Sequence, residues 1–457
     1  MNWFIKSKSI LTFVLAVFYI ANIFLSVPLI TRLNFILLVY LVITSFLQVR
    51  STARLVAYFL FVVSFSLLIY YKAPLEVWVQ GIGRNLYLIV MFTLAPLLAF
   101  PIRHGGYTKA LKDMFKRYTR KDSDFYFGVS FMSFFLGVMV NIGALPLMYE
   151  ICQSSEQRKN HKLLGTSICR GITSSIIWAP NYATTALVLE LTRAKWSAIF
   201  PYGVLLGISA IIVGWLNIKF NERGLNNKLV IKSNEPQDKI NWLQIFELFI
   251  FTMVLILGIV LISEFTGLAT VIVVSMVALI FPICWLVYLG KPEIFITEFM
   301  DNYFPNNLPR LKNEIVLFTG AGLFSTAVVF SHLGDFIPAF LVGLTGNNIL
   351  LLSSAVILIT ILLGLIGIHP IITITIIGST VPPSMFDNSS AFLALTLTAA
   401  WSLATTLSPS SANVISMAGL VNHSLIEVGP KWNVKYVFTV AMVFIVILNI
   451  LHAYNLL

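Results

Sequence analysis

Long apolar runs are the feature that most constrains the fold of this chain. Runs of about 17 or more apolar residues recur along the sequence, and each is long enough to cross a bilayer. The 457 residues are 58% hydrophobic and only 11% charged, which excludes an ordinary soluble protein. The sequence therefore predicts an all-α polytopic protein of the cell (inner) membrane, with the lipid bilayer as its surroundings.

The net charge of +11 does not require a nucleic-acid partner, because membrane proteins carry excess Lys and Arg in their cytoplasmic loops. Cys152, Cys169 and Cys284 show no paired spacing, so neither a disulfide framework nor a metal site is expected. No Walker motif is visible, so no ATP drive is expected. We predict no cofactor, apart from Na⁺ as a coupling ion.

Two of the apolar runs are interrupted by polar residues and proline. In 401–419 the polar stretch 405–413 surrounds Pro409, and in 170–187 Thr173, Ser174 and Ser175 precede Pro180 and Asn181. Proline inside a helix removes a hydrogen bond and breaks the helix. Freed backbone groups at bilayer depth are tolerated only inside protein or beside a wet cavity. Broken helices in corresponding positions of two halves indicate a transporter site built from an internal repeat.

Two further runs are predicted to be re-entrant hairpins. The run 125–152 has an irregular centre with Asn141, Gly143 and Pro146, and basic residues flank both of its ends. A single crossing would leave one basic cluster outside, whereas a hairpin keeps both in the cytoplasm. The run 349–379 is interrupted around Gly367 and His369. The alternative is that these small residues only permit close helix packing.

These segments define the expected organisation, with a cytoplasmic N-terminus. Inside the first core unit we expect a hairpin at 125–152 and a broken helix at 163–192, and inside the second a hairpin at 349–379 and a broken helix at 391–421. Residues 332–348 are expected to form a short outer segment, 291–314 a polar cytoplasmic connection, and 103–121 an amphipathic helix on the inner membrane surface. The units are scaffold helices 1–124, first core 125–218, cytoplasmic linker 219–241, second scaffold helices 242–348, second core 349–430 and a C-terminal helix 431–457.

The distribution of basic residues supports this topology. Most of the 30 Lys and Arg residues fall in segments expected to be cytoplasmic, as the positive-inside rule requires. Arg170 alone lies within a span, and the outer segments carry Arg32, Lys72, Arg84, Arg193 and Lys195. The two core units are therefore expected to be inverted repeats, each with a re-entrant hairpin and a broken transmembrane helix.

In these features the chain resembles the ion transporter superfamily, which includes divalent-anion:sodium symporters and arsenite-efflux carriers. The matching motifs are 171–175 leading to Pro180 and Asn181, and 404–406 leading to Pro409 and Asn413. The symporters usually have Ser-Asn-Thr at the hairpin tips, and only Asn141 carries over here. The resemblance implies a core that moves like an elevator on a scaffold that forms a homodimer.

Hydroxyls, amide oxygens and unwound carbonyls beside a helix break are suited to bind Na⁺ and substrate. The Na⁺ site is expected near Asn141, Thr173, Asn181, Thr405 and Asn413. The candidate substrate and ion site comprises Asn141, Gly143, Thr173, Ser174, Ser175, Pro180, Asn181, Gly367, His369, Thr405, Thr406, Ser408, Pro409, Ser410, Ser411 and Asn413.

Two charged or titratable residues have alternative interpretations. Arg170 either offers a counter-charge to an anionic substrate or snorkels toward the cytoplasmic surface. His369 is either a packing residue or a carrier of the coupling proton.

The leading hypothesis is a secondary transporter of a small, anionic solute, coupled to Na⁺ or H⁺. An uncoupled channel or a lipid-translocating protein is the alternative. An enzyme is not expected, because no clustered nucleophile, carboxylate pair or metal-ligand set lies at membrane depth.

Overall fold

The computed structural model confirms an all-helical, polytopic membrane fold. It describes residues 3–49, 51–118, 121–224, 240–346, 348–387 and 389–457, and among these no strand occurs. Eleven helical segments of the described chain are long and apolar enough to cross a membrane. Most of the linker expected at 219–241 lies outside the described residues.

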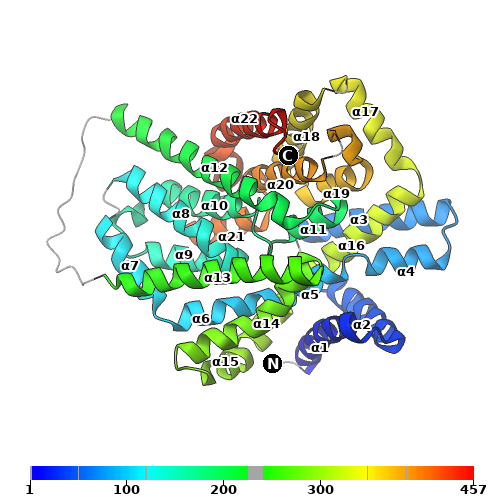
Figure 1. Cartoon of the computed structure of the whole chain (residues 1–457), viewed down its shortest axis with the longest axis horizontal. Coiled ribbons are helices and arrows are strands. Elements are labelled where there is room, and N and C mark those ends of the chain that lie inside the picture. The colour runs from blue at the N-terminus through cyan, green and yellow to red at the C-terminus, as the bar shows by residue number, and fades with distance from the viewer. Residues whose placement is uncertain (1–2, 50, 119–120, 225–239, 347, 388) are drawn as a thin grey trace.

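The described residues of the first half form twelve α-helices (Figure 1). They are α1 (Trp3–Leu25), α2 (Pro28–Phe46), α3 (Ser51–Tyr70), α4 (Leu75–Gly83), α5 (Leu86–Leu94), α6 (Ala99–His104), α7 (Tyr107–Tyr118), α8 (Asp122–Val140), α9 (Ala144–Cys152), α10 (His161–Ser175), α11 (Ala183–Thr192) and α12 (Trp196–Gly224). Short 3₁₀ turns are η1 (Ala95–Leu98), η2 (Asn141–Gly143) and η3 (Glu156–Lys159).

Ten α-helices are formed by the part of the second half that the structure describes. They are α13 (Trp242–Thr266), α14 (Thr270–Tyr288), α15 (Glu293–Glu298), α16 (Lys312–Phe330), α17 (Phe336–Thr345), α18 (Ile349–Leu365), α19 (Pro370–Thr380), α20 (Ser390–Leu407), α21 (Ala412–Val421) and α22 (Trp432–Ala453). Between them lie 3₁₀ or π turns η4 (Phe299–Asn307), η5 (Leu308–Leu311), η6 (Leu333–Asp335), η7 (Pro383–Phe386) and η8 (Glu427–Lys431).

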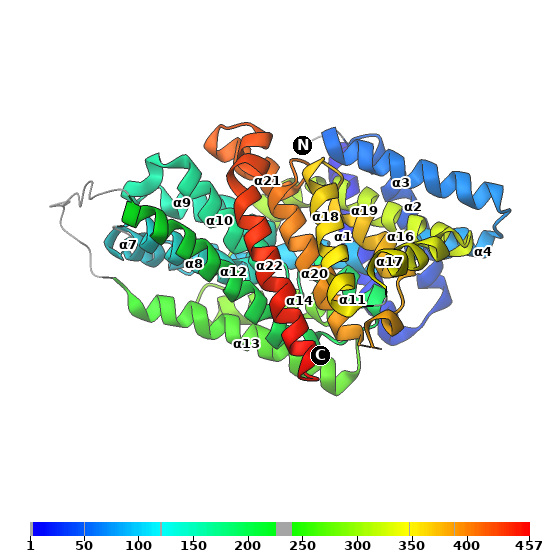
Figure 2. The same cartoon turned by 90° about the horizontal axis from the view of Figure 1, so that it is seen from above.

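The same order of elements occurs twice in the core. A helical pair α8 and α9 precedes the interrupted helix α10 and α11, and the pair α18 and α19 precedes the interrupted helix α20 and α21. α8 packs along α10, and α18 packs along α20. The repeats also exchange contacts, because α11 packs against α19 and α21 packs against α9 (Figures 1 and 2). Each broken helix therefore has its second half against the hairpin of the other repeat.

The remaining helices surround this core, and three segments differ from expectation. The span expected at 85–101 begins earlier, because Leu75–His104 is one helical segment. The polar connection expected at 291–314 is helical, since Phe299 and Tyr303 pack against aromatic rings of other helices. The outer segment expected at 332–348 contains the apolar helix α17, which meets α18 at a bend of 117°.

Helix α7 is amphipathic as expected, but its apolar face covers protein. Tyr107, Leu111 and Phe115 are buried, and α7 packs against α9 and α13. Lys112 Nζ lies 2.8 Å from Glu150 Oε1 of α9. The helix thus connects α9, the second arm of the first hairpin, to the surrounding helices. Its apolar side chains are covered by protein.

The contact of α8 with α10 is close enough to require glycine at one position. A Cβ atom on Gly171 would lie 2.3 Å from the backbone oxygen of Ser130. We expect Gly171→Ala to destabilise the protein by about 1–3 kcal/mol, as overpacking usually does. Thermal unfolding of the purified protein measures this. Gly419→Ala in α21 is the matched control, because nothing lies within 4 Å of its Cβ position. Equal melting temperatures for the two variants would contradict the close α8–α10 contact.

Candidate functional site

The two broken helices cross at hydroxyl side chains. Ser402 Oγ of α20 donates to the backbone oxygen of Thr173 in α10, at 2.6 Å. Thr406 Oγ1 lies 2.9 Å from Thr173 Oγ1 and 2.9 Å from the backbone oxygen of Ser402. These residues lie about 230 positions apart in the sequence, in the two motifs that the sequence identified as corresponding parts of a repeat. They meet just before each of the two helices ends.

Each helix is interrupted where proline was expected to break it. α10 ends at Ser175 and α11 begins at Ala183, and α20 ends at Leu407 and α21 begins at Ala412. A hydroxyl bridges each gap: Thr185 Oγ1 donates to the backbone oxygen of Ile176 at 2.9 Å, and Ser411 Oγ donates to that of Thr405 at 2.8 Å. Backbone carbonyls freed by the breaks are thus partly satisfied by side chains from the following half-helix.

The tip of the first hairpin reaches the first break. Asn141 Nδ2 donates to the backbone oxygen of Asn181 at 2.8 Å. Asn141 itself ends α8 with φ 56° and ψ −137°, a conformation that non-glycine residues rarely adopt. Such strain is characteristic of functional sites. Gly143 lies in the same turn.

Two asparagine side chains at the breaks have unused hydrogen-bonding capacity. Neither Oδ1 nor Nδ2 of Asn181 has a hydrogen-bond partner within the described protein, although both atoms are buried. Nδ2 of Asn413, at the start of α21, is buried and unpartnered as well. Buried polar groups are nearly always paired, and an exception calls for a partner that the protein itself does not provide. These two residues occupy corresponding positions in the two motifs.

The other candidate residues surround this point in a closed arrangement. Pro180 is buried and Pro409 is half-buried. The hydroxyls of Thr173, Ser174 and Ser175 donate back to carbonyls of α10, and Thr173 Oγ1 also accepts a hydrogen bond from Thr406 Oγ1. The sequence indicated a solvated pocket, whereas these side chains are only 0–8% exposed: Thr173, Ser174, Ser175, Asn181, Thr405, Thr406, Ser408, Ser410, Ser411 and Asn413.

The second hairpin is placed differently from the first. Its tip has Gly367 at φ +95°, and a Cβ there would meet nothing within 4 Å. His369 Nδ1 accepts a hydrogen bond from the backbone N–H of Ile371 at 3.2 Å, so the ring caps α19. α18 contacts the second broken helix beside Gly364, whose Cβ position lies 3.0 Å from Ala404 Cβ. The role of His369 as a proton carrier stays a prediction.

The Arg170 side chain is buried and reaches the start of α22. Its Nε donates to Asn433 Oδ1 at 2.9 Å, and its Nη2 donates to the backbone oxygen of Trp432 at 3.1 Å. The guanidinium lies 4.0 Å from the centroid of the Tyr436 ring. Because none of the described acidic residues forms an ion pair with it, α10 carries an uncompensated cation into the core.

Several residues of this region were not identified from the sequence. Ser402 lies one helical turn before Thr406, and that spacing within a polar helix face was the available signal. Tyr182, whose hydroxyl lies 3.2 Å from Ser175 Oγ, is part of the first break. Asn433 holds Arg170 from α22, and only the tertiary fold brings the two together.

Comparison with known proteins identifies the fold. No protein-family model matches the chain, and no curated protein matches its sequence. The YdaH transporter of Alcanivorax borkumensis is similar in structure, with a TM-score of 0.54 at 15% identity, over 89% of this chain and 90% of that one. Neisseria gonorrhoeae MtrF, described as one of a class of antimetabolite efflux pumps, aligns with a TM-score of 0.48 at 13% identity, over 78% and 80% of the chains. At these identities the likeness to YdaH concerns the fold.

The chain is thus a multi-pass membrane protein with the fold of the YdaH structure. Its distinguishing feature is a pair of interrupted helices that cross at hydroxyl groups and leave amide groups unpaired beside the breaks.

Proposed function

We propose that the protein is a secondary active transporter of a small, anionic solute, coupled to Na⁺ or H⁺. The observation that carries this proposal is the pair of buried, unpartnered asparagine side chains, Asn181 and Asn413, at the two helix breaks. A bound ion or solute would supply the partners that the protein lacks. The similar fold of YdaH, which is described as a transporter, agrees with this role.

The composition of the site favours Na⁺ as a coupling ion and an anion as cargo. Carbonyl, amide and hydroxyl oxygens around Asn141, Thr173, Asn181, Thr405 and Asn413 are ligands of the kind that bind Na⁺ at broken helices. The buried Arg170 without an acidic partner gives the core a positive charge, which an anionic solute would offset. His369 is the candidate for H⁺ coupling.

The arrangement of the helices is suited to an elevator-like movement. The core comprises the two hairpins, both broken helices and α12, and part of its contact with the surrounding helices is polar and exposed. Glu264 at the end of α13 bonds Ser197 Oγ at 2.6 Å and lies 3.7 Å from Lys195 Nζ. Exposed ion pairs of this kind contribute little stability, so they can break and reform as a core moves. The scaffold would form the homodimer contact in the inner membrane, with the N-terminus in the cytoplasm.

Gradient-driven uptake tests the proposal. We expect purified protein in proteoliposomes to accumulate a labelled carboxylate or oxyanion when an inward Na⁺ or H⁺ gradient is imposed, and to lose the accumulation when an ionophore collapses the gradient. A panel of carboxylates, oxyanions and amino-acid conjugates identifies the solute. If flux equilibrates equally fast without a gradient, the protein is a channel and not a secondary transporter. If labelled lipid is scrambled, it is a lipid-translocating protein.

A further inference from the structure

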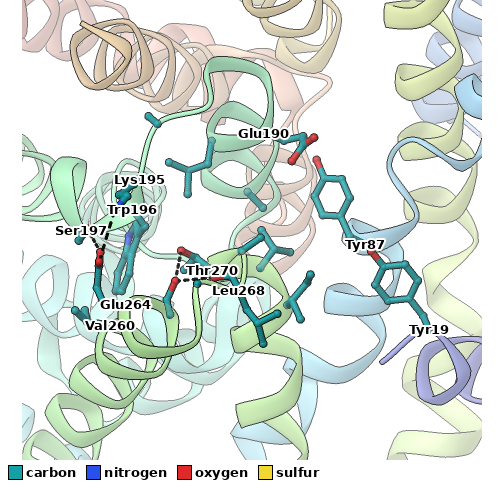
Figure 3. A pocket seen from close by; sticks show the side chains of 18 of the residues that line it. Tyr19, Tyr87, Glu190, Lys195, Trp196, Ser197, Val260, Glu264, Leu268 and Thr270 are labelled. Carbon is teal, nitrogen blue, oxygen red and sulfur yellow. Dashed lines mark hydrogen bonds and ion pairs between the residues drawn. The ribbon is translucent and has the colours of Figure 1, made fainter. Parts of the chain in front are cut away.

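A second potential binding site lies away from the helix breaks. A cavity of about 470 Å³ opens between the α11–α12 turn of the core and the α13–α14 turn, with α1 and α5 on its other side (Figure 3). This volume is in the range of small-molecule sites. None of the candidate residues at the helix breaks lines it.

The charges that line the cavity are balanced, and two of them are unpaired. Lys195 and Glu264 form an ion pair with each other at 3.7 Å, and Ser197 also bonds Glu264. Arg84 and Glu190 also line the cavity, and neither forms an ion pair with a described residue, although their charges are close enough to interact. The cavity therefore offers one cation and one anion that are not in direct contact with each other, rather than an excess of either sign.

The cavity wall beside Glu190 is aromatic and includes an unsatisfied hydroxyl. Tyr87 Oη is buried without a hydrogen-bond partner, and in Figure 3 this hydroxyl points toward the Glu190 side chain. Tyr19 stands beside Tyr87, and the indole of Trp196 borders the opposite part of the cavity. Leu189 and Leu268 add apolar surface. A buried polar atom left unpaired beside a cavity calls for a partner that the described protein does not supply.

We propose that this cavity binds a small zwitterion of the amino-acid type with an apolar or aromatic side chain. Its carboxylate would pair with Arg84, its ammonium group would lie between Glu190 and Tyr87, and its side chain would rest on the tyrosine rings. Balanced, separated charges favour a zwitterion over a simple anion or a simple amine, because either of these would leave one charge of the wall unpaired. The proposal does not depend on the proposed transport function, since it concerns different residues.

Calorimetric titration of the full-length protein in nanodiscs tests the proposal with three matched compounds. L-phenylalanine carries both charges, phenylacetate carries only the carboxylate, and phenethylamine carries only the ammonium group. We expect saturable binding of phenylalanine and binding of the other two that is weaker by roughly tenfold or more, the factor for one lost charge-assisted hydrogen bond. No binding of phenylalanine, or equal binding of all three compounds, would overturn the proposal.

Charge-neutral variants assign the binding to this cavity. Arg84→Gln and Glu190→Gln are each expected to weaken phenylalanine binding by roughly tenfold. Arg32→Gln and Glu76→Gln remove the same charges from exposed positions on α2 and α4, and should bind phenylalanine as the unchanged protein does. Asn181→Ala should also retain binding, which separates this site from the transport site. If Arg84→Gln and Glu190→Gln bind normally while remaining folded by thermal unfolding, the two residues form only a solvent-separated ion pair and the proposal fails.

Discussion

Replacing Asn181 or Asn413 by alanine is expected to reduce gradient-driven transport by roughly 10- to 100-fold without destabilising the protein. Each substitution removes a side-chain donor or acceptor for the bound ion or solute. The loss of one charge-assisted hydrogen bond corresponds to a roughly 10- to 100-fold loss of affinity. The amide of Asn181 has no partner within the described protein, so its removal leaves no protein group unsatisfied. The melting temperature should therefore stay equal or rise slightly while uptake falls.

A partnered asparagine of the membrane region provides the control for this result. Asn449 of α22 donates to Ser353 Oγ at 3.2 Å and to the backbone oxygen of Ile445 at 2.8 Å. Asn449→Ala should show the opposite behaviour, with a lower melting temperature and retained uptake per folded molecule. Wild-type transport by both Asn181→Ala and Asn413→Ala would show that the helix breaks do not bind the cargo or the ion.

Replacing Arg170 by lysine is expected to destabilise the core by about 1.5–3 kcal/mol, the range for hydrogen bonds to charged groups. Lysine keeps the charge but cannot reproduce the planar contacts of the guanidinium with Asn433, the Trp432 carbonyl and the Tyr436 ring. Thermal unfolding measures the loss, and a double-mutant cycle with Asn433→Ala should show positive coupling. The KM of transport should stay unchanged.

Two results distinguish a structural role of Arg170, in which it binds α22, from a role as counter-charge to the solute. Arg54→Lys is the matched control, because Arg54 bonds Tyr58 Oη and stacks on its ring at an exposed position, where the loss should be negligible. If Arg170→Lys keeps the melting temperature but raises KM several-fold, the guanidinium contacts the anionic solute directly. In that case the contacts with α22 would be secondary.

The helix breaks were predictable because their signal is local. Proline among hydroxyls inside an apolar run is costly in hydrocarbon unless the helix stops there, so Pro180 and Pro409 marked both interruptions. Asn141 beside Gly143 likewise marked the hairpin tip that contacts Asn181. The repeated order of elements followed from these positions and from the basic residues at the flanks.

Other features depend on tertiary contacts that local patterns do not contain. The polar segment 291–314 was expected to be a connection, but its aromatic side chains bury against α1 and α6, and this packing makes it helical. Nothing in the sequence pairs Arg170 with Asn433, which lies more than 260 residues later. The cavity beside Arg84 and Glu190 is also formed by helix turns that only the fold brings together.

If the two helix breaks line the transport site, they must open to water during transport, because the site is closed in the present conformation. Cysteine accessibility tests this opening most directly, in a protein whose own three cysteines are replaced by alanine. Ser410→Cys lies at the second break, and Ala399→Cys, about two turns before the end of α20, is the buried control. We expect a charged thiol reagent to label Ser410→Cys, more slowly when the solute is bound, and not to label Ala399→Cys. Equal inertness of the two positions would contradict this expectation.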